Sequence, residues 1–234
     1  MANQRTIRAD LHSHTHFSKD ALTTPEEFVK RNVAARIDCV AVSDHNNVDG
    51  ALAVKRLAPF RVIVSEEIRS TEGEIIGYFL NETVPKGLTP EETVRAIQEQ
   101  GGLVGVPHPF DRARGSPLTT PALLRILPSV QILEIFNARN IFQADNRRAA
   151  AFAARHGLAA SAGTDAHWGP EIGRTYVRMP DFANRDDFLE ALRQGKITGH
   201  AASPLVHLMS TLAKMRYRLG MSPVPDCLTP GSLP

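Results

Sequence analysis

The sequence predicts an α/β fold, either a barrel or a doubly wound sheet. Short apolar runs, the first at 7–11 and another at 39–42, alternate six or seven times with segments typical of helices. Such alternation implies parallel strands joined by right-handed crossovers. Polar residues follow the apolar runs directly, and in both architectures function gathers at the carboxyl ends of the strands. We therefore expect a polar site at one end of the sheet.

Local signals define the individual elements. Thr24-Pro25-Glu26-Glu27 predicts a helix N-terminus with a capping box, and Thr89-Pro90-Glu91-Glu92 repeats that chemistry before a helix that stops at Gly101-Gly102. Thr71-Glu72-Gly73-Glu74 indicates a hairpin turn within 68–80. The remaining expected strands are 61–64, 103–106, 131–135 and 158–161, and the remaining expected helices are 48–57, a short one from 121, 143–156 and 184–194.

The C-terminal part is expected to differ from the barrel domain, which we place at 1–202. Leu205, Leu208, Leu212, Met215 and Leu219 recur at helical spacing, which predicts an amphipathic helix at 203–220 packed on the barrel. A membrane-surface or dimerisation helix is the alternative interpretation. The segment 221–234 holds four prolines and is expected to be disordered.

Composition narrows the class of protein. The 234 residues are 42% hydrophobic and 22% charged, and the formal net charge is +2, from scattered Lys and Arg. This balance argues against nucleic acid as the partner. Two cysteines, Cys39 and Cys227, make a disulfide framework improbable, and no apolar run reaches the roughly 18 residues of a membrane span. We expect a cytoplasmic protein without a signal peptide or membrane span; its oligomeric state stays open.

Metal-donor residues gather at the predicted strand ends. His12 and His14 are two residues apart after the first strand, so in an extended chain both rings lie on one face. Imidazoles mixed with carboxylates suit zinc, manganese or iron, and so many donors predict two or three divalent ions. The nine donors are His12, His14, Asp20, His45, Glu67, His108, Glu134, Asp165 and His167.

These motifs resemble, in the same order, those of the PHP family of metal-dependent phosphoesterases, named after polymerase and histidinol phosphatase. The matching runs over about 7–180 are Asp-Leu-His-Ser-His-Thr, Ser-Asp-His-Asn, Glu-Glu-Ile before a Gly-Glu hairpin, Pro-His-Pro, Glu-Ile-Phe-Asn and Gly-Thr-Asp-Ala-His. The resemblance implies a distorted (β/α)7 barrel with a trinuclear metal centre. It also implies the ligand sets: His12, His14 and Asp165 for the first metal, Glu67 as a bridge, His108 and Glu134 for the second, and Asp20, His45 and His167 for the third. Glu67 is preferred to Glu66 because the family ligand precedes an apolar residue, here Ile68.

The expected activity is hydrolysis of a small phosphorylated metabolite, of the nucleotide, sugar phosphate or histidinol phosphate class, by a metal-bridging hydroxide. Arg139 is the first candidate to hold the phosphoryl oxygens, and Arg112 or Arg114 is the second. Asp44 is counted with the catalytic residues and is expected to orient a neighbour by hydrogen bonding. His167 is counted with the catalytic residues as well as with the ligands.

The alternatives are an exonuclease-like phosphodiesterase, an amide hydrolase and a non-catalytic scaffold. An amide hydrolase of this kind would favour a bridging Lys, and no strand-end Lys is evident. A scaffold would show loss of ligands.

Overall fold

The computed structural model describes residues 5–203 and 206–219. The segment 221–234 and Leu205 lie outside this range. Strands β1–β9 are Thr6–Ser13, Cys39–Val42, Arg61–Ser70, Gly73–Tyr78, Leu103–Val106, Ile132–Asn137, Ala159–Gly163, Thr175–Pro180 and Lys196–Gly199. Helices α1–α7 are Pro25–Ala34, Asp49–Leu57, Pro90–Glu99, Thr120–Ile126, Gln143–His156, Arg185–Arg193 and Val206–Arg218, and short 3₁₀ helices lie at Leu127–Ser129 and Gly169–Glu171.

Within the described residues, nine strands form one sheet in the order β7-β6-β5-β4-β3-β2-β1-β8-β9. The sheet curls so far that β7 returns to β1: His14 N–H donates to Ala166 O at 3.0 Å, and Asp165 N–H donates to His12 O at 2.8 Å. The result is the nearly closed, barrel-like α/β fold that the sequence predicted. It brings 12–14 against 165–167.

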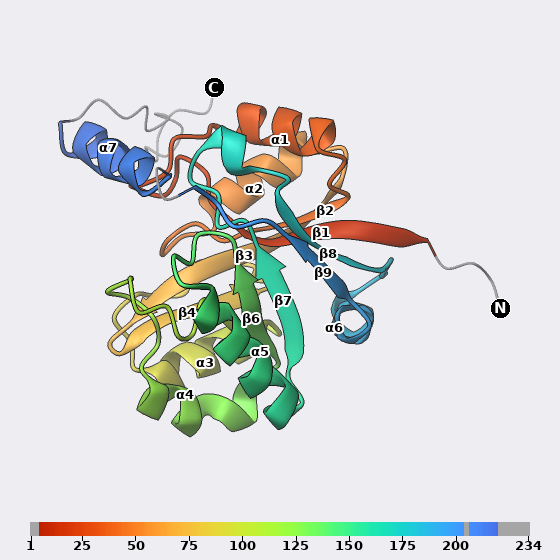
Figure 1. Ribbon diagram of the computed structural model, residues 1–234, viewed down its shortest axis with the longest axis vertical. Coiled ribbons are helices and arrows are strands. Elements are labelled where there is room, and N and C mark those ends of the chain that lie inside the picture. Colours follow the sequence, from red (N-terminus) through yellow and green to blue (C-terminus); the bar gives the residue numbers. More distant parts are fainter. Residues whose placement is uncertain (1–4, 204–205, 220–234) are drawn as a thin grey trace.

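Helices cover the outside of the curled sheet, with α1 and α2 on one side and α3, α4 and α5 on the other (Figure 1). Residues of β2 alternate between two apolar clusters, because Val40 and Val42 belong to one and Cys39 and Ala41 to the other. Burial on both faces explains why this strand is a continuous apolar run.

The predicted helix starts are confirmed. The Thr24 side chain accepts the Glu27 N–H before α1, but the Glu27 carboxylate pairs with Arg31 Nε at 2.6 Å instead of completing the capping box predicted there. Thr89 and Glu92 form the reciprocal capping box before α3. At the end of α5, Gly157 adopts φ 65°, the left-handed conformation that suits a helix C-terminus.

Not all strands are parallel, in contrast to the expectation from the alternation of strands and helices. The hairpin predicted within 68–80 exists as β3 and β4, which are antiparallel, but β3 is continuous with the predicted strand 61–64. In addition, β8 runs antiparallel to β1, and β9 pairs antiparallel with β8. The short, partly exposed β9 carries too little apolar pattern to have been expected from sequence.

The C-terminal helix differs from the prediction in the face it buries. On α7, Val206, Ser210 and Ala213 are buried, whereas the predicted apolar stripe is open to solvent: Leu208 is 57% and Met215 53% exposed. Figure 1 shows α7 lying at the periphery of the molecule, so only one side of the helix meets the barrel. No described helix is both long and apolar enough to cross a membrane.

Candidate metal centre

The junction of β1 and β7 forms the first group of donors. The Nε2 atoms of His12 and His14 lie 3.1 Å apart, and His14 Nε2 lies 3.2 Å from Asp165 Oδ1. All three side chains are buried. The chain after β1 therefore presents both rings to one point, as the alternation of an extended strand predicts.

Glu67 of β3 lies at the centre of the donor cluster. Its Oε2 is 3.5 Å from His12 Nε2 and 3.1 Å from His45 Nδ1, and its Oε1 is 2.9 Å from His108 Nε2. The neighbouring Glu66 points to the opposite face, where it accepts the Val84 N–H at 2.8 Å. The geometry thus favours Glu67 over Glu66 as a bridging ligand.

A third group lies beside the first two. Asp20 Oδ1 is 3.5 Å from the Nε2 atoms of both His45 and His167. His167 Nδ1 lies 2.7 Å from the Asp165 carbonyl oxygen, to which only a protonated nitrogen can donate. This hydrogen bond orients the imidazole ring so that Nε2 is directed toward Asp20.

The chemistry of the cluster fits bound divalent cations. Glu67 Oε2, Asp165 Oδ1 and Asp20 Oδ1 are buried without a hydrogen-bond donor among the described residues, and they face imidazole nitrogens. Burial by itself raises the pKa of Asp165, but Arg114 and His12 hold it well below its ordinary value, so the carboxylate is charged. Three sets of donors each bring their ligand atoms within 4.8 Å of one another: His12, Glu67 and His108; His12, His14 and Asp165; and His14, His45 and His167.

Glu134, expected to bind the second metal, lies behind the donors instead. It faces His12 Nδ1 at 3.1 Å and accepts the His108 N–H at 2.7 Å and Asn137 Nδ2–H at 3.0 Å. Its carboxylate is therefore occupied in orienting two histidines. A register shift in β6 between Glu134 and Phe136 accompanies this placement, and such irregularities re-aim side chains.

Glu74 is a candidate donor that the sequence analysis missed. Its Oε2 is buried, lacks a hydrogen-bond donor among the described residues and lies 3.8 Å from His108 Nε2. The pairing of residues across the predicted hairpin could have identified Glu74 from the sequence. Glu67 pairs with Ile76 across β3 and β4, and two residues further along the strand Glu74 returns to the same face.

Asp44, predicted among the catalytic residues, is buried away from the cavity. It accepts Thr15 N–H at 2.8 Å and the hydroxyls of Thr15 and Ser18 at 2.6 Å. Asp44 therefore shapes the loop after β1, in keeping with the orienting role expected for it. Asp10 has a comparable structural role that was not predicted from the sequence. It accepts hydrogen bonds from the N–H and the hydroxyl of Thr164 and so connects β1 to the chain after β7.

The three arginines proposed to hold phosphate have different surroundings. Arg114 pairs with Asp165 and with Asp111 and lines the cavity over the donors. Arg112 is an exposed side chain that pairs with Asp145. Arg139 also lines the cavity, but its Nη2 donates to Val206 O at 3.0 Å and to Ser210 Oγ at 2.7 Å. Hydrogen bonds thus engage Arg139 with α7 and Arg114 with two carboxylates, and the Asp165 partner of Arg114 belongs to the donor cluster.

A cavity of about 560 Å³ opens over the donors, and a second hollow of about 470 Å³ adjoins it. Both share Asp20, His45, Glu74 and Lys214. The lining of the second hollow includes Lys19, Arg69 and Lys86. The mouth of the site is therefore more basic than the small net charge of the chain suggests, which favours an anionic substrate.

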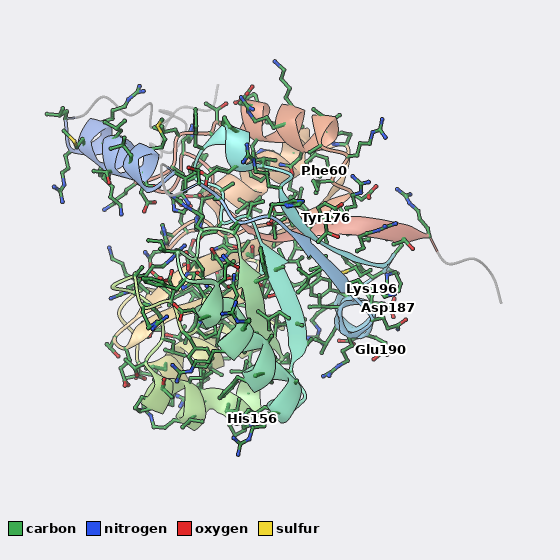
Figure 2. The ribbon with its side chains drawn as sticks, viewed as in Figure 1. Phe60, His156, Tyr176, Asp187, Glu190 and Lys196 are labelled. Carbon is green, nitrogen blue, oxygen red and sulfur yellow. The ribbon has the colours of Figure 1, made fainter. Side chains whose placement is uncertain are left out.

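Among the histidines left out of the predicted ligand sets, His156 lies on the far side of the molecule. Figure 2 shows it at the end of α5, away from the carboxyl end of β7. Its ring packs on Phe152 with the centroids 4.3 Å apart. It thus provides a matched control for substitutions of the cluster histidines.

Comparison with known proteins agrees with this architecture. The PHP domain model matches residues 10–81, and the PHP-associated model matches 143–197. The uncharacterized Methanocaldococcus jannaschii proteins MJ1587 and MJ0417 are 40% identical over 146 residues and 32% identical over 201 residues. These alignments cover 56% and 80% of this chain, and 82% and 79% of the two relatives.

Solved structures share the fold at low sequence identity. A two-domain protein from Bacteroides vulgatus that contains a predicted PHP-like metal-dependent phosphoesterase is 18% identical, with a TM-score of 0.65 over 86% of this chain. The lesion-specific endonuclease EndoQ of Pyrococcus furiosus is 17% identical, with a TM-score of 0.64 over 86% of this chain. The chain spans 66% and 60% of these two longer proteins.

A barrel with imidazole and carboxylate donors at its strand ends defines the class of metal-dependent hydrolases. Within that class, the chain belongs to the PHP family. The enzyme class expected from the sequence, a phosphoric ester hydrolase, is confirmed.

Proposed function

We propose that the protein hydrolyses a phosphoric ester of a small molecule with two or three divalent ions, of zinc, manganese or iron, held by the donor cluster. The observation that carries the proposal is the set of buried carboxylate oxygens that face imidazole nitrogens without a hydrogen-bond donor among the described residues. In such a site, bound cations polarise phosphoryl oxygens and lower the pKa of water.

The chain supplies the binding and orientation that this chemistry needs. His12, His14 and Asp165 would hold one ion, His108 and Glu67 a second, and His45, His167 and Asp20 a third. Glu134 turns His12 Nε2 toward the cluster by its contact with Nδ1. Arg114 lines the cavity with its guanidinium beside Asp165, where it could pair with phosphoryl oxygens as well.

The size of the cavity supports a small substrate. A volume of about 560 Å³ lies within the range of roughly 300–1,000 Å³ typical of small-molecule sites. We also place the protein in the cytoplasm, where thiols such as that of the buried Cys39 stay reduced.

Cleavage at a nucleic acid end is the second candidate. The basic second hollow with Lys19, Arg69 and Lys86 favours it, because such cations could follow a phosphate backbone. The likeness in fold to an endonuclease adds a reason to test it.

The test is a substrate panel on protein reconstituted separately with zinc, manganese or iron. An aryl phosphate, nucleotides, sugar phosphates and an end-labelled oligonucleotide would be compared, with bound metal quantified in each preparation. We expect metal-dependent release of phosphate from a small ester. His12→Ala and Asp165→Ala should abolish it, and His156→Ala should not. Activity that survives the first two substitutions would contradict the proposal, and preference for the oligonucleotide would favour the second candidate.

A further inference from the structure

Helix α7 lies beyond the segments that match the family models, which end at residue 197, yet it forms part of the cavity wall. Ser210 and Lys214, one turn apart on α7, line the cavity beside Asp20 and His167. The helix therefore brings side chains to the donor cluster that no strand of the barrel provides.

Arg139 fastens α7 to the barrel. Its side chain is buried, and Nη2 donates to both Val206 O and Ser210 Oγ, while Nη1 donates to the Asp165 carbonyl at 3.4 Å. One guanidinium thus joins the first turns of α7 to the loop that carries the ligand Asp165. Glu171 balances its charge, with Oε1 3.4 Å from Nε.

Apolar burial contributes little to this docking. Leu208, Leu212, Met215 and Leu219 of the predicted stripe are 42–69% exposed. Among the described side chains of α7, the buried ones are the small or short Val206, Ser210 and Ala213. Besides Arg139, the Lys214–Asp20 ion pair and the cation–π contact of Lys19 with Tyr217 join α7 to the barrel, but each involves an exposed lysine and therefore contributes less than a buried hydrogen bond. The contacts of Arg139 should therefore decide where α7 lies.

Lys214 is the cation that α7 carries to the site. Its Nζ lies 3.3 Å from Asp20 Oδ2, and the side chain lines both the main cavity and the second hollow. It is 57% exposed, so the ammonium group retains free hydrogen-bonding capacity toward the cavity. A phosphoryl group that enters between the donors and the mouth would meet this charge.

We propose that Lys214 is a substrate-binding residue and that Arg139 is a positioning residue that docks α7 and so places Lys214 over the metal donors. The part that concerns Lys214 rests on the proposed phosphoesterase function. The part that concerns Arg139 stands on the contacts of α7 alone.

The first experiment compares Lys214→Gln, Lys214→Arg and the control Arg216→Gln, which makes the same charge change on α7 outside the cavity lining. Steady-state kinetics on an aryl phosphate, the inhibition constant of inorganic phosphate and bound metal would be measured. For Lys214→Gln we expect KM and the phosphate inhibition constant to rise roughly 10- to 100-fold, the effect of losing a hydrogen bond to a charged group. Metal content should not change, Lys214→Arg should recover most of the loss, and Arg216→Gln should resemble the wild type.

Two results would overturn the role of Lys214. One is phosphate inhibition equal in Lys214→Gln and Arg216→Gln. The other is a loss of metal in Lys214→Gln with KM unchanged, which would make Lys214 only a partner of Asp20. If the wild type hydrolyses no phosphoester and binds no phosphate, the proposed function has failed instead.

The second experiment needs no activity. Trp168 is the only tryptophan of the chain, and it lines an apolar groove together with Val206, Leu208 and Met209 of α7. Its fluorescence should therefore report whether α7 is docked. Ser210→Ala removes one contact of Arg139, whereas Arg139→Gln removes the whole guanidinium. Relative to the wild type, we expect Trp168 emission to shift to the red and acrylamide quenching to increase in both variants, and more in Arg139→Gln than in Ser210→Ala.

Lys214→Gln should shift the emission of Trp168 far less than Arg139→Gln, because the ion pair of the exposed Lys214 with Asp20 contributes less to docking than the buried hydrogen bonds of Arg139. Far-ultraviolet circular dichroism would verify that each variant is folded. Emission identical to the wild type in both folded Ser210→Ala and folded Arg139→Gln would overturn the positioning role of Arg139. Should Arg139→Gln fail to fold, Ser210→Ala alone decides the question.

Discussion

Gly163 allows a sharp test of how the barrel closure builds the metal centre. It ends β7 where that strand passes β1, and a Cβ added there would lie 2.3 Å from His12 Cβ and 2.8 Å from His12 N. Carbon atoms pack at about 3.5–4.0 Å, so Gly163→Ala requires the two strands to separate by about 1 Å. Overpacking of this kind costs roughly 1–3 kcal/mol, and a displacement of about 1 Å at a reactive site can reduce the rate about 100-fold.

The matched control is Gly157→Ala at the end of α5. Gly157 has φ 65° and open space around the position of a Cβ, so the substitution should cost about 1 kcal/mol through backbone strain alone. Urea unfolding and metal titration would be run on both variants. Both should be destabilised, but only Gly163→Ala should bind metal more weakly. Equal metal affinity in the two variants would refute the inference that the closure positions His12.

Three further predictions concern carboxylates. Glu67→Gln should lower bound metal and abolish hydrolysis, whereas the matched Glu66→Gln, which keeps an oxygen to accept the same backbone N–H, should do neither. Glu134→Gln should weaken metal binding by roughly 10- to 100-fold without removing a site, as loss of an orienting partner does; complete loss of an ion would show direct ligation. Burial raises the pKa of Asp181, but Arg61 lowers it below the ordinary 3.8, so the stabilisation by this pair is present above that pH and lost in acid. Asp181→Asn should therefore cost no more than about 1 kcal/mol in urea unfolding at pH 7 and nothing well below pH 3.8; an equal cost at both pH values would contradict the assignment.

The parts of the fold with local causes could be predicted from sequence. Helix starts at Thr24 and Thr89 depend on side chains within three residues, and both were predicted correctly. The positions of His12, His14 and Asp165 follow from strand alternation and from the rule that strand ends meet at one edge. Their mutual distances required the closure of β1 on β7, which depends on contacts distant in sequence.

The direction of a side chain at a strand end was harder to predict. Glu134 occupies a ligand-type position in the sequence, yet the register shift in β6 accompanies its placement behind His12. Glu74 was missed because it lies on the antiparallel strand of a hairpin. The expectation that site residues follow the carboxyl ends of parallel strands does not apply to such a strand.

The role of Arg139 depends on a helix that packs on the barrel through polar groups. Periodicity of the leucines predicted the existence of α7 but the wrong buried face, since hydrogen bonds to Val206 and Ser210 decide its orientation. Such contacts leave no periodic signal in a sequence.

Anomalous X-ray scattering from crystals of the metal-reconstituted protein would show whether the donor cluster binds ions. We expect at least two metal peaks that share Glu67, one of them bounded by His12, His14 and Asp165 and the other by His108. Metal peaks only at other positions, or a fully loaded active protein without an ion beside Glu67, would contradict this expectation.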